Sequence, residues 1–149
     1  MVVDNCPVPT TTTAGTFSDV IRITEPGLTT LGNLFSFAVP SGAAVTDGTL
    51  TVRVFGDIDG VAGGGNDEFW TISDESSNVV GTAGGTGDFA DQCVNEITEV
   101  FTIAMADIDT WTGDGSVDFT ADDIAGNINI NGLCNPGEYV ELEFTYDFE

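Results

Sequence analysis

Oxygen-bearing side chains and glycines fill a loop between two strand-like segments in the first half of the chain. The first segment, residues 50–55, alternates apolar and polar side chains, and the second begins at Phe69. The oxygen-bearing residues around this loop are Asp57, Asp59, Asn66, Asp67 and Glu68. Ca²⁺ takes about six to eight oxygen ligands in proteins, and glycine lets backbone carbonyls come close to an ion. These residues are the predicted ligands of a Ca²⁺ site, with a solvated hairpin loop as the alternative.

The spacing of this loop excludes an EF-hand. An EF-hand loop needs an acid or amide at its fifth position, glycine at its sixth and glutamate at its twelfth. Counted from Asp57, those positions hold Val61, Ala62 and Glu68, so only the last fits. The glycine run also lacks the tandem spacing of a β-roll repeat. Any ion site here is therefore of another kind.

The charge balance restricts the partners that the protein can have. The chain has 25 acidic residues, two arginines, no lysine and no histidine, which gives a net charge of −23. Such a surface repels nucleic acid and anionic membranes and attracts cations or a basic partner. Solubility in a salty setting is the alternative explanation, because salt screens repulsion between carboxylates. We predict no nucleic-acid partner, and no apolar run approaches the ~20 residues needed for membrane insertion.

The residue inventory also argues against catalysis. Without histidine the chain lacks the usual general base, and without lysine it cannot form a Schiff base. A carboxylate pair can serve a glycosidase, but nothing beyond the abundance of acids indicates such a pair. The three cysteines have no cationic neighbour in sequence to activate a thiolate. We therefore predict that the protein is not an enzyme.

Three cysteines, Cys6, Cys93 and Cys134, permit one disulfide and leave one thiol. The favoured pair, Cys93 and Cys134, would close a loop of about 40 residues, worth roughly 4 kcal/mol in the chain-entropy model. Pairing of Cys6 with Cys134 and fully reduced thiols are the alternatives. The Gly-, Thr- and Asp-rich composition fits an extracellular, cell-surface or virion-surface location, where disulfides persist. The N-terminus lacks the basic and apolar regions of a signal peptide, which predicts either a mature segment or export by another route, such as a virus particle.

Short strand-like segments recur at about ten-residue spacing, separated by turn signals. The clearest is the last, where Val140, Leu142, Phe144, Tyr146 and Phe148 alternate with polar residues. About nine such strands predict an all-β protein built as a two-sheet antiparallel sandwich. Residues 106–111 are expected to form one short helical turn, and residues 127–131 a short edge strand.

Residues 1–14 are predicted to form an extended N-terminal arm, followed by a single β-sandwich domain at residues 15–149. Pro7 and Pro9 interrupt regular strand pairing, and a threonine run follows them. The arm, which also carries Cys6, is either a loose terminus or a segment that docks on a neighbour.

A series of short segments carries a family resemblance: LTVRVFGD at residues 50–57, NDEFW at 66–70, Gly81, Gln92-Cys93, IAMADIDTW at 103–111, GSVDF at 115–119 and VELEFTY at 140–146. Together they resemble a galactose-binding-like jelly-roll module of bacterial secreted and surface proteins, over residues 45–148. The resemblance implies a jelly-roll sandwich, often with a structural Ca²⁺, that is used for adhesion or display.

A second acidic cluster and two tryptophans complete the candidate residues. The cluster comprises Asp107, Asp109, Asp114, Asp118, Asp122 and Asp123. We expect surface positions for them, with Asp107 and Asp114 as caps of the helical turn, and a second ion as the alternative. Trp111 should share a buried face with Ile108, whereas Trp70 is a candidate for stacking on a sugar or, as in most sandwiches, part of the core.

These observations predict a non-catalytic, acidic β-sandwich that acts as a structural or interaction module on the outside of a cell or virus particle. It would serve as an assembly subunit, adhesin module or virion decoration protein, stabilised by Ca²⁺. Its expected partners are copies of itself or another surface or virion protein, contacted through the arm or a sheet edge. The alternative is a Ca²⁺-dependent carbohydrate-binding module with a glycan partner.

Overall fold

Strands dominate the computed structural model, which describes residues 13–58, 68–85, 93–126, 128, 130, 134 and 137–149. Within these residues the strands are β1 (Gly15–Thr24), β2 (Asn33–Ala38), β3 (Gly48–Phe55), β4 (Phe69–Asp74), β5 (Val79–Gly84), β6 (Ile97–Ile103), β7 (Ser116–Asp122) and β8 (Tyr139–Phe148). The helical part is a short helix, α1 (Met105–Trp111), followed by a 3-10 turn, η2 (Thr112–Asp114). The predicted arm, with Cys6, Pro7 and Pro9, lies outside the described residues up to residue 12.

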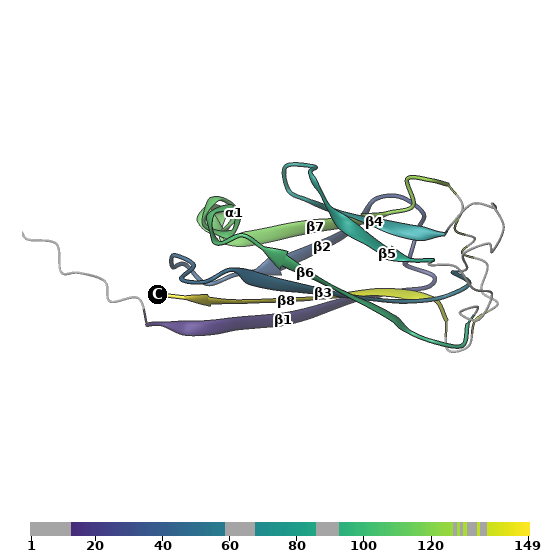
Figure 1. Ribbon diagram of the computed structural model, residues 1–149, viewed down its shortest axis with the longest axis horizontal. Helices are drawn as coiled ribbons and strands as arrows, with labels where there is room; N and C mark the ends of the chain where they lie inside the picture. Colours follow the sequence, from purple (N-terminus) through teal and green to yellow (C-terminus); the bar gives the residue numbers. More distant parts are fainter. Residues whose placement is uncertain are drawn as a thin grey trace, which may run out of the picture.

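The described strands form two antiparallel sheets that pack face to face (Figure 1). Sheet A has the order β1-β8-β3-β6, and sheet B has the order β2-β7-β4-β5. The pairs β1/β8, β2/β7, β3/β6 and β4/β5 join the two halves of the chain as one long antiparallel hairpin folded over itself. This is the strand order of a jelly roll. The predicted all-β, two-sheet sandwich with one short helical turn is confirmed.

Alternation along the strands explains why the two sheets bury a common core. In β3 every second side chain is fully buried, and β2, β7 and most of β8 follow the same pattern. A period of two places one set of side chains between the sheets and the other set in water. Phe144 of β8 lies at the centre, with its ring 5.8 Å from Phe37 and 5.4 Å from both Phe119 and Tyr146. The core therefore holds both sheets in register through aromatic contacts.

Helix α1 covers one end of the sandwich, as the sequence predicts. Ile108 and Trp111 are both buried, and the Trp111 ring meets Phe119 edge-on at 5.9 Å. The prediction that Asp107 caps this helix is wrong. The N-cap residue is Ala104, which makes no side-chain cap bond, and Asp107 lies inside the first turn. The free N–H of Met105 instead donates to Asp47 Oδ1 at 3.0 Å, from the end of the β2–β3 connection.

The predicted edge strand at residues 127–131 is only partly within the described residues. Ile128 and Ile130 are described, and neither belongs to a strand. Ile128 is buried against the core, and Ile130 packs on it while half-buried. The Ile128 N–H donates to Asp123 Oδ2 at 2.9 Å, so a side chain rather than a neighbouring strand satisfies this backbone group.

Gly81 allows the two sheets to close along the flank formed by β5 and β6. The Phe101 ring of β6 lies so close to the β5 backbone that a Cβ on Gly81 would be 2.2 Å from Phe101 Cε1. No side chain fits at that distance unless the ring or the strand moves. Gly81 is therefore required by packing between the sheets.

Gly81→Ala is expected to lower the free energy of unfolding by about 1–3 kcal/mol, because overpacking forces a core side chain out of place. Urea denaturation would measure the change. Gly113→Ala is the matched control, since a Cβ on Gly113 meets nothing within 4 Å, and it should change stability by less than about 0.5 kcal/mol. Equal stability losses in the two variants would contradict the packing explanation.

Candidate functional site

The predicted Ca²⁺ loop is only partly visible. Asp57, after β3, and Glu68, before β4, are described, whereas Asp59, Asn66 and Asp67 lie outside the described residues. Glu138 was not foreseen from the sequence. It is only 2% exposed, and its carboxylate lies close to Gly56, next to Asp57. In the described part of the chain no three His, Cys, Asp or Glu residues are placed to hold a metal ion. The Ca²⁺ site stays a prediction.

A disulfide joins Cys93 and Cys134, with their Cα atoms 5.1 Å apart and a sequence separation of 41. This confirms the favoured pairing. The Cys93 N–H donates to the Gly56 carbonyl at 2.8 Å, so the disulfide is tied to the start of the acidic loop. A covalent link at this end restrains the segments that lead into β6 and β8.

Both tryptophans belong to the core. Trp70 is 1% exposed and Trp111 is 7% exposed. Trp70 Nε1 is buried and has no hydrogen-bond acceptor among the described residues. A ring buried to this extent presents no face to a ligand, so the prediction that Trp70 stacks on a sugar is wrong and the core alternative holds.

Carboxylates act as acceptors for backbone N–H groups at the ends of strands and in loops. Asp109 Oδ1 accepts from Ala44 N–H at 2.6 Å, which fixes α1 to the β2–β3 connection. Asp123 accepts from Gly126 N–H at 2.8 Å as well as from Ile128 N–H. Asp114 accepts from Ser116 N–H at 3.0 Å, across the turn between η2 and β7. Much of the second acidic cluster therefore serves local structure.

Four carboxylates line a polar pocket of about 230 Å³ on the outer side of sheet B: Asp74, Glu75, Asp114 and Asp118. Asp118 N–H donates to Glu75 Oε1 at 2.8 Å. Asp118 Oδ1 is buried and has no hydrogen-bond partner among the described residues. Partial burial and, after it, the negative charges of the other three carboxylates raise the pKa of Glu75, while the bond from Asp118 N–H opposes the rise. The pocket has a strongly negative potential.

Glu75→Gln is expected to stabilise the fold at neutral pH, because glutamine can still accept from Asp118 N–H but adds no charge. A carboxyl whose pKa is raised by folding destabilises the fold above its folded pKa and has no effect below its ordinary value of 4.5. The gain should be below about 1 kcal/mol, because Glu75 is only partly buried and water screens its charge. Denaturation at a series of pH values should show the gain vanish towards pH 4.5, and a gain independent of pH would contradict this origin.

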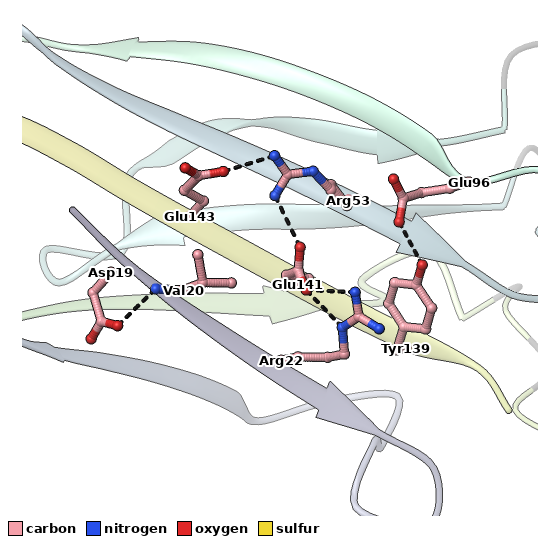
Figure 2. Close-up of polar contacts among 8 residues, drawn as sticks. All are labelled: Asp19, Val20, Arg22, Arg53, Glu96, Tyr139, Glu141 and Glu143. Carbon is pink, nitrogen blue, oxygen red and sulfur yellow. Dashed lines mark hydrogen bonds and ion pairs between the residues drawn. The ribbon is translucent and has the colours of Figure 1, made fainter. Parts of the chain in front are cut away.

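Both arginines of the chain lie in one cross-strand network on the outer face of sheet A (Figure 2). Arg22 of β1 and Arg53 of β3 stand on either side of Glu141 of β8, in the paired register of the three strands. Arg22 Nη2 lies 2.6 Å from Glu141 Oε2, and Arg53 Nη1 lies 2.9 Å from Glu141 Oε1. Arg53 Nη2 also pairs with Glu143 Oε2 at 2.7 Å. We call Arg22, Glu141, Arg53 and Glu143 the charged ladder.

An aromatic pair closes one end of the charged ladder. The Arg22 guanidinium lies 3.9 Å from the centroid of the Tyr139 ring, a cation–π contact. Phe55 stacks on the same ring at 5.5 Å. The Tyr139 hydroxyl donates to Glu96 Oε2 (Figure 2). Burial and the bond to Glu96 raise the pKa of Tyr139, and the bond to Glu143 most strongly raises that of Arg53. Arg53 therefore keeps its positive charge throughout the physiological pH range.

The alternation of polar and apolar residues in the sequence contains a signal for the ladder. Glu141 and Glu143 alternate with buried residues, which already places them on the wet face of the last strand. Both arginines occupy strand segments with the same alternation. What the sequence lacks is the strand order, because β1, β8 and β3 are far apart in the chain.

Comparison of the chain with protein-family models, with curated proteins and with solved structures finds no match. The class of protein is therefore defined by the fold and the site. It is an all-β jelly-roll sandwich with one disulfide in its described part and a charged ladder on the outer face of one sheet. No helix in the described residues has the length and apolar character that a membrane crossing requires.

Proposed function

We propose that the protein is a non-catalytic structural or interaction module on the outside of a cell or virus particle, where it contacts copies of itself or another surface protein. The outer face of sheet A carries this proposal. It places both arginines in a rigid network on a broad, exposed sheet surface. Such a surface suits contact with a macromolecule better than the enclosure of a small substrate.

The disulfide supports an extracellular or particle-surface location, because structural disulfides persist in oxidising surroundings and are rare in the cytosol. Capsid and lectin domains also use the jelly-roll fold, an analogy that agrees with a particle-surface or extracellular location. The net charge of −23 would keep copies soluble and would prevent non-specific association. Contact between copies then depends on the few places where charge is balanced.

Self-association is expected to strengthen with salt, since salt screens repulsion between two chains of net charge −23. The screening length falls from about 30 Å at 0.01 M to about 3 Å at 1 M ionic strength. Sedimentation velocity of the full chain at rising NaCl and protein concentrations would measure the association. A monomer under all these conditions would contradict assembly from copies of this chain.

A bound Ca²⁺ at the loop between Asp57 and Glu68 would stabilise the module. The buried Glu138 carboxyl group beside Gly56 supports this, because it adds carboxyl oxygens, which Ca²⁺ prefers as ligands, near the base of that loop. The glycines of the loop would let backbone carbonyls complete the coordination.

Millimolar Ca²⁺ is expected to raise the melting temperature by a few degrees relative to EDTA, since extracellular Ca²⁺ sites with Kd values of about 0.1–1 mM yield on the order of 1 kcal/mol at such concentrations. Asp57→Asn should reduce this shift, whereas Glu75→Gln, in the pocket on sheet B, should keep it. Mg²⁺ at the same concentration controls for general screening. An equal loss in both variants, or an unchanged melt in wild type, would count against a site in this loop.

A Ca²⁺-dependent carbohydrate-binding module is the second candidate. The observation that favours it is the half-buried Phe55–Tyr139 ring pair, because Phe55 lies only two positions before Asp57. Aromatic faces beside an ion site are suited to sugar stacking. A glycan array with and without Ca²⁺ separates the candidates: a monomer that binds a glycan only with Ca²⁺ favours this one.

A further inference from the structure

We propose that two copies of the chain meet face to face through the outer surface of sheet A, around a two-fold axis that runs parallel to the strands between β8 and β3. This inference rests on the proposed function, in which copies of the chain contact each other, and it names the surface and the geometry of that contact. Three features support it: the charge of this face, the order of its residues across the strands, and the state of the sheet edges.

The outer face of sheet A is close to neutral in a strongly acidic protein. Among the paired positions of β1, β8, β3 and β6, it carries both arginines and only three of the 25 acidic residues, Glu141, Glu143 and Asp147. Glu96, just before β6, adds a fourth carboxylate at the margin of the face, where it accepts from the Tyr139 hydroxyl. Most other positions on the face are threonine, serine or valine. Two copies can approach through this face with little repulsion. A basic partner would have no preference for it over the acidic remainder of the surface.

The residues of the face are ordered so that the surface is complementary to itself. Across the sheet, one row reads Arg22, Glu141, Arg53 and Thr98, and the next reads Val20, Glu143, Thr51 and Val100. With a two-fold axis between β8 and β3, each row of one copy lies against the same row of the other copy in reverse order. An isologous interface requires this arrangement. Glu141 of one copy then faces Arg53 of the other, twice.

The same operation brings exposed apolar side chains together. Val20 of one copy faces Val100 of the other, again twice, and these valines are 47% and 62% exposed. The hydroxyl-bearing residues of the following row, such as Thr145 and Thr49, face each other near the axis. The contact therefore combines opposite charges, two apolar pairs and small polar side chains, as interfaces of moderate affinity do.

The edges of sheet A are guarded against the competing mode, addition of a strand from a second copy. Asp19 of β1 and Glu99 of β6 occupy inward-facing positions opposite the buried Phe144 and Val52, where an edge strand deters pairing by carrying a charge. Asp19 Oδ1 also accepts from Val20 N–H at 2.8 Å, on the side of β1 away from β8 (Figure 2). The Val20 N–H, which an incoming strand would need as a donor, is therefore already satisfied.

The size of the face sets the expected strength. Four strands about 4.8 Å apart, with paired positions extending roughly 25 Å, offer on the order of 500 Å² per copy. This is less than the roughly 800 Å² per partner of a stable complex, so a dissociation constant of about 10 μM or weaker is expected.

Matched valine substitutions on the two sheets test the surface. Val100→Glu on β6 should weaken self-association at least tenfold in sedimentation equilibrium, because it sets a carboxylate against Val20 of the other copy. Val79→Glu on β5 of sheet B is the control, since Val79 is 61% exposed and the change in charge is the same. It should alter the dissociation constant less than threefold. Circular dichroism would verify that both variants are folded.

Cysteine cross-linking tests the geometry. In a Cys6→Ser background, chains with Val20→Cys and chains with Val100→Cys should form a mixed disulfide dimer on oxidation, and neither should form a dimer alone. Self-cross-linking of Val20→Cys would overturn the two-fold arrangement. Equal weakening by Val100→Glu and Val79→Glu, or association abolished by Cys6→Ser alone, would overturn this face as the contact while leaving self-assembly intact. A wild-type chain that stays monomeric would overturn both this contact and the proposed self-assembly.

Discussion

The chain carries 25 acidic side chains and only two guanidinium groups, so nearly every acidic side chain must be stabilised without a cationic partner. The fold meets this constraint mainly with its own backbone. Free N–H groups occur at helix starts, tight turns and strand ends, and a carboxylate that accepts from such a group gains a charge-assisted hydrogen bond. Asp47 at the start of α1 and Asp109 against Ala44 are two such acceptors. Carboxylates thus contribute to the connections, while the aromatic core holds the sheets.

The charged ladder lies where a carboxylate cannot obtain a backbone N–H donor. Within a sheet the backbone donors are used by neighbouring strands, so an acid on the outer face needs either water or a cation. Glu141, in the central part of sheet A with its side chain 12% exposed, is the acid on this face furthest from water. Both arginines are paired with it. The two guanidinium groups donate to both oxygens of the Glu141 carboxylate, which satisfies this largely buried group. Arg53 also donates to Glu143.

The sequence allows the layers of this fold to be predicted better than their connections. Period-two alternation identifies the inward faces of β3 and β8, and the i, i+3 spacing of Ile108 and Trp111 identifies the buried side of α1. Local patterns fail where the partner is distant. Met105 is capped by Asp47, 58 positions away, rather than by its neighbour Asp107. The charged ladder cannot be predicted from local patterns for the same reason, since Arg22 and Glu141 are brought together only by the pairing of the first and last strands. Trp70 remained a candidate for sugar binding because the residues next to it in sequence do not show whether its whole ring is buried.

The arrangement of the ladder also bears on how a weak contact could be specific. An arginine that is free in solution loses considerable side-chain entropy when it becomes fixed at an interface. Arg53 is already held by Glu141 and Glu143, and Arg22 is held by Glu141 and the Tyr139 ring, so most of that loss has occurred on folding. A surface of this kind approaches its partner in one conformation, and its opposite charges favour a single register. At the contact that we propose, this preorganised and nearly neutral face would set the orientation of association even where its area gives only moderate affinity.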